Sequence, residues 1–104
     1  MGYWHPEARK QLDSLDQKVK DETERLVKEF EEEGLKHSKI GKVKQTNPEL
    51  DLWRLKIDSD REGVNHRLLL DEFYDQFVYY GIYPREDAYK VESIIEVMER
   101  KYDS

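Results

Sequence analysis

The sequence predicts an α+β fold: an N-terminal helical hairpin packed on a small curved antiparallel sheet of three to four strands, followed by a C-terminal helix. Apolar side chains recur every three or four positions in residues 6–33 and again in residues 91–101, the period of a helix. In residues 52–57 they alternate with basic side chains, the period of a strand. A length of 104 residues suits one small domain, which we expect to cover residues 1–104.

The N-terminal part contains two expected helices. A short first strand at residues 3–5 precedes Pro6, which suits the first position of a helix. The residues spaced to share its apolar face are Ala8, Leu12 and Leu15. Asp16 can cap a second helix, and Gly34 can end it. The buried stripe of this second helix comprises Val19, Leu26, Val27 and Phe30.

Three expected strands form a meander. They cover residues 52–57, 64–70 and 76–83, joined by polar turns at 58–63 and 71–75. In the first strand, Trp53, Leu55 and Ile57 share one face, which we assign to packing. Arg54 and Lys56 share the other face, which is either a substrate-facing pair or an ordinary solvated surface.

The chain closes with a helix that runs to about Lys101, after residues 84–87 break the last strand. Its apolar face comprises Val91, Ile94, Ile95 and Met98. This stripe is either part of the core or the contact for a partner helix.

Composition excludes several classes of protein. With no cysteine, the chain has no disulfide, thiolate zinc site or cysteine nucleophile. Its apolar runs are too short to span a membrane, and its start lacks the features of a signal peptide, so we expect a cytoplasmic protein. His5, His37 and His66 have no ligand spacing, and we expect neither a metal nor a cofactor.

The charge is uneven along the chain. Residues 46–104 hold 8 basic and 14 acidic side chains, which accounts for the net charge of -6. By contrast, residues 34–48 contain no acid. The basic side chains there are Lys36, His37, Lys39, Lys42 and Lys44. Such a stretch either contacts phosphate or forms a solvated loop whose lysines balance nearby carboxylates.

Four segments on this framework resemble the RelE/ParE toxin superfamily. They are HPEA at 5–8, LDLWRLKI at 50–57, HRLLL at 66–70 and YPREDAYK at 83–90. The last is similar to the Pro-Arg-x-x-Ala-Tyr-Lys ending of archaeal-type members. The resemblance implies the toxin of a type II toxin–antitoxin module. RelE-like members enter the ribosomal A site and cut messenger RNA, whereas ParE-like members inhibit DNA gyrase.

The resemblance also implies which residues act on RNA. Cleavage without a metal requires cations on the phosphate and one general acid–base pair. The expected catalytic residues are Arg54, Lys56, Arg67, Arg85 and Tyr89, and the expected substrate-binding residues are Lys42, Lys44 and His66. Arg67 would grip phosphate oxygens, or else form a salt bridge with a nearby acid. Arg85 would stabilise or protonate the leaving group.

The roles of the remaining side chains stay open. Tyr89 either stacks on a base and assists proton transfer, or packs under the last helix. His66 has a suitable pKa for proton transfer, but it precedes Arg67 on a strand, so we expect their side chains on opposite faces. Glu86 is an alternative base or a surface carboxylate.

The leading hypothesis is a ribosome-dependent mRNA endoribonuclease that inhibits translation, with the ribosome, mRNA and a helical antitoxin segment as partners. The alternatives are a ParE-like gyrase inhibitor and a catalytically inactive binding protein of the same fold. The acidic balance of the chain supports the last of these.

Overall fold

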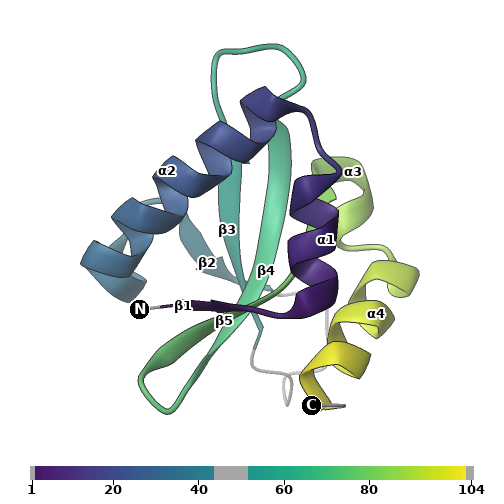
Figure 1. Cartoon of the computed structure of the whole chain (residues 1–104). Coiled ribbons are helices and arrows are strands. Elements are labelled where there is room, and N and C mark those ends of the chain that lie inside the picture. The colour runs from purple at the N-terminus through teal and green to yellow at the C-terminus, as the bar shows by residue number, and fades with distance from the viewer. Residues whose placement is uncertain (1, 44–51, 103–104) are drawn as a thin grey trace.

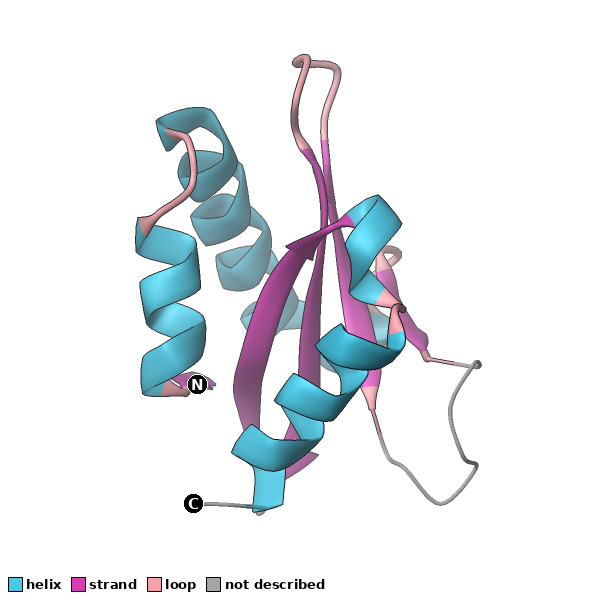
Figure 2. Ribbon diagram, turned by 90° about the vertical axis from the view of Figure 1, so that its right-hand side faces the viewer, coloured by secondary structure: helices cyan, strands magenta, loops and turns pink. Residues whose placement is uncertain are grey.

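The computed structural model describes residues 2–43 and 52–102, which form a sheet between two layers of helices (Figures 1 and 2). The helices are α1 (Pro6–Asp13), α2 (Gln17–Glu33), α3 (Arg85–Ala88) and α4 (Val91–Tyr102), with a 3₁₀ turn, η1, at Gly34–Lys36. The strands are β1 (Gly2–Trp4), β2 (Ile40–Lys42), β3 (Trp53–Asp58), β4 (Asn65–Phe73) and β5 (Gln76–Pro84). The predicted α+β class is confirmed.

The strand order is β1-β5-β4-β3-β2. The predicted meander is the antiparallel part of the sheet, in which β3, β4 and β5 pair in succession. At one edge β1 pairs with β5 in parallel, and at the other edge β2 pairs with β3 antiparallel. The described residues therefore contain five strands rather than the expected three to four.

Two parts of the expected meander differ in the structure. The basic stretch is not all loop, because Ile40–Lys42 adds to the edge of the sheet as β2. The turn predicted at 71–75 is shorter, because the β4–β5 ladder continues to the pair Phe73↔Gln76. Only Tyr74 and Asp75 remain at the tip, and both have positive φ values, 50° and 65°. A tight hairpin turn favours such values, which allow long strands to pair to their ends.

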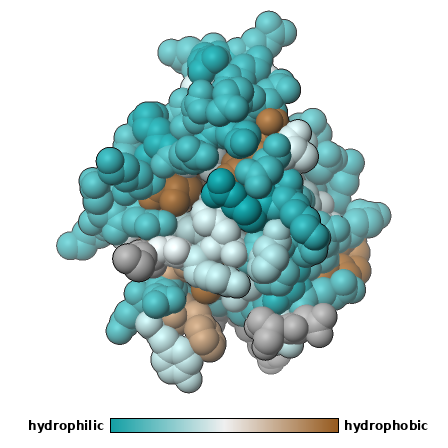
Figure 3. Space-filling model, viewed as in Figure 1, coloured by the Kyte–Doolittle hydropathy of each residue, from teal (hydrophilic) through white to brown (hydrophobic). Residues whose placement is uncertain are grey.

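The face of the sheet beneath α1 and α2 carries the larger apolar cluster. Leu55 and Ile57 of β3 lie in it with Leu68 and Leu70 of β4, and Trp53 packs against it, as the alternation in β3 predicts. From α1 and α2 it includes Leu12, Val19, Leu26, Val27 and Phe30. Asp16 is the residue before α2, as predicted, but its side chain makes no capping hydrogen bond. Figure 3 shows this side of the molecule as mainly hydrophilic, with small apolar areas between the helices.

The opposite face carries a smaller cluster beneath α3 and α4. Its buried members are Val43, Leu52, Leu69, Tyr80, Tyr83, Ala88 and Val97. In α4 the buried side faces the sheet through Ser93 and Val97, with Ile94 packed beside them. Val91 and Ile95, predicted to belong to the apolar stripe, are 70% and 51% exposed. The buried side of α4 therefore runs through Ser93 and Val97 rather than through Val91 and Ile95.

Candidate nucleic-acid interface

A row of cations crosses the face of the sheet opposite α1 and α2. Lys56 of β3 pairs with Arg67 of β4, which pairs in turn with Tyr83 of β5, so these three side chains leave the same face. Arg54 lies two residues before Lys56 and shares that face. The amide of Lys56 donates to the carbonyl of Lys39, which extends the row beyond β3 (3.1 Å). We call Lys39, Arg54, Lys56 and Arg67 the cation face.

Arg67 is held in place by hydrogen bonds and is largely buried, with 6% of the residue exposed. Its Nη1 donates to Asn65 Oδ1 (3.1 Å) and to the carbonyl of His66 (2.9 Å). Within residues 2–43 and 52–102, no carboxylate lies within ion-pair distance of Arg67. The salt bridge considered from the sequence is therefore not seen there. A held guanidinium with remaining N–H donors is suited to an anionic ligand.

Arg54 lies flat across the edge strand, and Gly41 makes this possible. Gly41 of β2 pairs with Arg54, whose Nη1 donates to the carbonyl of Lys39 (2.9 Å). A Cβ at Gly41 would lie 2.8 Å from Nη2 of Arg54. The absence of a side chain at this position therefore keeps the guanidinium against the sheet and beside Lys56.

Asp58 places a carboxylate among these cations. Its Oδ1 accepts from Lys39 Nζ at 2.6 Å. This hydrogen bond holds the pKa of Asp58 below its usual range, and the charges of Arg67 and Lys56 lower it further. The lowered pKa keeps the carboxylate ionised at neutral pH, and with 41% of the side chain exposed it is accessible.

Tyr83, at the end of the row, holds α4 rather than facing the cations. Its hydroxyl donates to Glu96 Oε1 (2.8 Å), and Arg100 donates to the same oxygen (2.6 Å). Arg100 also donates to the carbonyl of Tyr80 (2.8 Å). Burial raises the pKa of Tyr83, and its hydrogen bond to Glu96 raises it further. This network fixes α4 beside the cation face, on the side of β5.

Arg85 and Tyr89 lie at the two ends of α3. Arg85 begins this short helix directly after β5 and is exposed. Tyr89 follows it, is half-buried, and packs against the smaller apolar cluster. The packing alternative for Tyr89 is thus present in the structure. Because Pro84 pairs with His66, α3 starts beside the β4 end that carries Arg67.

The predicted substrate-binding residues are not gathered with the cation face. Lys42 pairs with Trp53, and its Nζ lies 5.1 Å from the centre of that ring, on the opposite face of the sheet. His66 faces away from Arg67, as expected, and is 8% exposed. Within residues 2–43 and 52–102, its Nδ1 has no hydrogen-bond partner. Burial lowers the pKa of His66, and the charge of Arg67 lowers it further, while Glu86 and Asp16 raise it. Lys44 lies outside the described residues.

Four residues of this site were not among the predicted catalytic or substrate-binding residues: Lys39, Gly41, Asp58 and Asn65. Of these, only Lys39 was one of the basic side chains of the stretch that the sequence linked to phosphate. Asp58 and Asn65 could have been found from the sequence. Asp58 lies two residues after Lys56, and Asn65 lies two residues before Arg67, so each shares a strand face with a predicted cation. Lys39 and Gly41 needed the pairing of β2 with β3, which a loop assignment for the basic stretch concealed.

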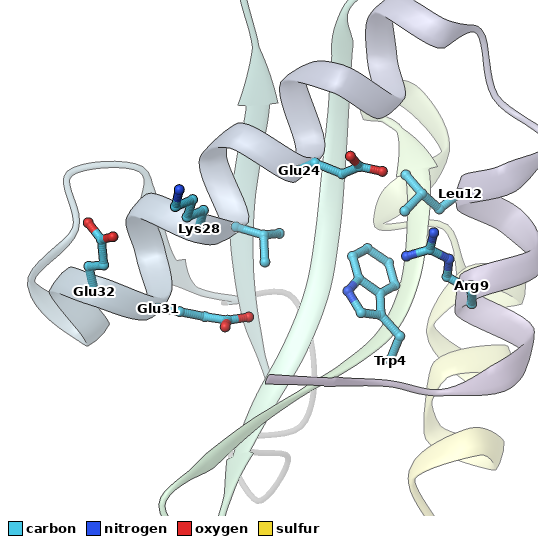
Figure 4. A pocket seen from close by; sticks show the side chains of 8 residues that line it. Trp4, Arg9, Leu12, Glu24, Lys28, Glu31 and Glu32 are labelled. Atoms are coloured by element: carbon cyan, nitrogen blue, oxygen red, sulfur yellow. The ribbon is translucent and has the colours of Figure 1, made fainter. Parts of the chain in front are cut away.

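Two hollows lie elsewhere on the molecule. One, of about 390 Å³, opens between α1 and α2, where the side chains of Trp4, Glu24 and Arg9 point toward one another (Figure 4). The other, of about 730 Å³, is a groove lined by aromatic residues from β1, the β4–β5 hairpin and the end of α4, including Tyr3, Phe73, Tyr80 and Tyr102. Neither contains a residue predicted to act on RNA.

One cluster in the described residues has metal-ligand composition. Glu29, Glu33 and His37 offer ligand atoms within 4.8 Å of one another at the end of α2. However, Nδ1 of His37 accepts the N–H of Lys39 (3.1 Å), so the neutral ring carries its proton on Nε2, toward the carboxylates. A metal on Nε2 would displace that proton and require a protonated Nδ1, which conflicts with the Lys39 bond. The arrangement fits a hydrogen-bonded histidine better than a metal ligand.

The geometry defines a small α+β fold with a cation face beside its last helix, and comparison with solved structures gives that fold a precedent. The chain has the fold of the E. coli toxin RelE: a mutant of that protein in the free state matches with a TM-score of 0.66. The match covers 96% of this chain and 98% of that chain at 17% sequence identity. No protein-family model matches the sequence, and no curated protein matches it significantly.

A search of residues 2–43 and 52–102 for membrane spans found no helix with the length and apolar character that crossing a bilayer requires.

Proposed function

We propose that this protein is the toxin of a type II toxin–antitoxin module and acts as a ribosome-dependent mRNA endoribonuclease in the cytoplasm. The observation that carries the proposal is the pairing of Lys56 with Arg67 on one face of the sheet, flanked by Arg54. The likeness in fold to the toxin RelE over nearly the whole chain supports it.

The cation face supplies what phosphodiester cleavage needs most. As the 2′-hydroxyl attacks, negative charge grows on the phosphate oxygens, and donors held in position stabilise it. Arg67 is held by Asn65 and a backbone carbonyl, so it loses little freedom on binding. Lys56 and Arg54 add charge along the strand. Arg85, exposed at the start of α3, is the proposed contact for the leaving group, and the partly exposed ring of Tyr89 is the proposed base-stacking residue.

A concentrated positive face offsets the acidic character of the chain as a whole. The net charge is -6, yet four cations meet a single described carboxylate, Asp58, on this face. Local potential, rather than net charge, governs the approach of an RNA strand within a Debye length of about 8 Å. The proposal therefore needs RNA to contact the β2–β3 side of the molecule.

An antitoxin partner is part of the same proposal. The aromatic groove of about 730 Å³ between β1, the hairpin tip and the end of α4 is the proposed apolar binding surface for a helical segment of the antitoxin. Phe73 and Tyr102 on its rim are 61% and 70% exposed. Large exposed apolar residues gathered in one groove are typical of a protein contact.

The test is primer extension across a reporter mRNA in a translating extract, with the wild type, Arg67→Ala and Lys42→Ala. We expect cuts in register with codons from the wild type and from Lys42→Ala, because Lys42 lies on the other face. We expect the cutting rate of Arg67→Ala to be lower by at least about a hundredfold. Circular dichroism establishes that each variant is folded.

Absence of cuts from the folded wild type would contradict the nuclease assignment, and trapped gyrase–DNA complexes in a parallel assay would replace it with gyrase inhibition. Equal cutting by folded Arg67→Ala would instead remove the cation face from the mechanism.

A further inference from the structure

We infer that Asp58 selects ribose: its carboxylate accepts a hydrogen bond from the 2′-hydroxyl of a nucleotide whose phosphate lies on Lys56 and Arg67. The cation face then prefers RNA to DNA of the same sequence. This inference rests on the proposed function, because it assigns a role within the same face.

Asp58 is positioned to contact the nucleotide that the cations hold. It ends β3 two residues after Lys56, on the same face, and pairs with Asn65, two residues before Arg67. Diagonal neighbours on paired strands lie about 7–8 Å apart, within reach of long side chains. A phosphate between Lys56 and Arg67 therefore brings its own sugar next to Asp58.

The carboxylate is fixed and still has acceptor capacity. Lys39 Nζ donates to Oδ1 (2.6 Å) and to the carbonyl of the same residue (3.3 Å). No side chain or amide in the described residues donates to Oδ2. With 41% of the side chain exposed, that oxygen is available to a ligand.

The chemistry of an ionised carboxylate explains the choice of sugar. Asp58 accepts hydrogen bonds but donates none, and phosphate oxygens are also acceptors. Within an internal nucleotide the 2′-hydroxyl is the sugar group that donates, and it distinguishes RNA from DNA. Deoxyribose would leave Asp58 beside a phosphate with repulsion and no hydrogen bond.

Recognition suits Asp58 better than proton abstraction. The Lys39 hydrogen bond lowers its pKa, so it is a weak base at neutral pH but a permanent acceptor.

Fluorescence anisotropy at low salt tests this with labelled single strands of one sequence, as RNA, DNA and 2′-O-methyl RNA. For the wild type we expect RNA to bind about tenfold more tightly than DNA, the usual scale for a hydrogen bond to a charged group. The 2′-O-methyl strand should behave as DNA, because it lacks the donor.

The Asp58→Ala variant should bind DNA and 2′-O-methyl RNA more tightly, because a negative charge is removed. RNA should not share this gain, because it loses the hydrogen bond to Asp58, so the RNA-to-DNA ratio should fall to about one. Asp60→Ala is the matched control: it removes an exposed carboxylate two residues away and should keep the wild-type ratio. Asp58→Asn preserves the shape and a weaker acceptor, and should give an intermediate ratio if the alanine variant fails to fold.

A wild type without preference for RNA, or a preference that survives in folded Asp58→Ala, overturns this inference. A ratio lost equally in Asp60→Ala overturns it as well, since general charge would then explain the effect. None of these results changes the codon-register cuts that test the proposed function, so the two proposals fail separately.

Discussion

The two faces of the sheet are built from the same strands but differ in chemistry. In β3, Leu55 and Ile57 are fully buried beneath the helical hairpin, whereas Arg54 and Lys56 on the other face remain partly exposed. The same alternation in β4 separates Leu68 from Arg67. In β3 a strand period of two therefore assigns Leu55 and Ile57 to stability, and Arg54 and Lys56 to binding. Substitutions at neighbouring positions should affect different measurements.

Leu68→Ala should produce the largest loss of stability. Leu68 is fully buried in the larger cluster, and removing such a side chain costs about 2–5 kcal/mol. Urea unfolding followed by tryptophan fluorescence measures this cost. The folded fraction should retain wild-type affinity for RNA. A loss of affinity at full folding would mean that the two faces are not independent.

Lys56→Ala should change binding and leave stability nearly unchanged. Removing one phosphate contact lowers the dependence of log K on log salt by about 0.7 for a single strand. Lys42→Ala is the control, since Lys42 lies over Trp53 on the opposite face and should leave that slope unaltered. Anisotropy titrations at several salt concentrations measure it. Equal slopes for the two variants would contradict the assignment of the faces.

Gly41→Ala should have a smaller effect on RNA affinity, about fivefold or less, because Arg54 loses one hydrogen bond. The added Cβ would lie 2.8 Å from Nη2 and push the guanidinium off the edge strand. Gly63→Ala, in the turn after β3, is the control, because it shows whether replacement of any glycine by alanine lowers the affinity for RNA. We expect it to affect stability, through its φ of 84°, but not binding.

The smallest predicted effect concerns pH. Burial lowers the pKa of His66 below its ordinary 6.5, so the unfolded chain takes up this proton first. Stability is therefore complete above that value and is lost as pH falls through and below it. Urea unfolding of the wild type and His66→Gln between about pH 7.5 and 5.5 measures the difference. The variant should show the flatter profile, and identical profiles would contradict this account.

The elements with strong periodicity could be predicted from the sequence. The two N-terminal helices, the three long strands and the last helix all exist where the pattern places them, because each buries an apolar stripe. The strand β2 could not be predicted, because Ile40–Lys42 is too short to show a period and is stabilised by pairing with β3. In α4, a stripe centred on Val97 was misjudged because Val91 and Ile95 are apolar yet exposed.

The candidate site was predicted only where it follows from a single strand. Alternation along a strand is enough to predict that Arg54 and Lys56 share a face. It also predicts that His66 and Arg67 lie on opposite faces. The placement of Lys56 beside Arg67 depends on register between strands, and that of Lys39 beside Asp58 on the pairing of a short edge strand. Such contacts are set by tertiary pairing, which local patterns do not contain.

The two outer strands have a consequence for behaviour in concentrated solution. β1 and β2 each contain three residues, while β4 and β5 at the centre contain nine each. The unpaired N–H and C=O groups of an outer strand are a template onto which another molecule can add. Here each template is short, and Lys42 places a charge on one of them. Short, charged edges of this kind disfavour the edge-to-edge addition of strands from other molecules.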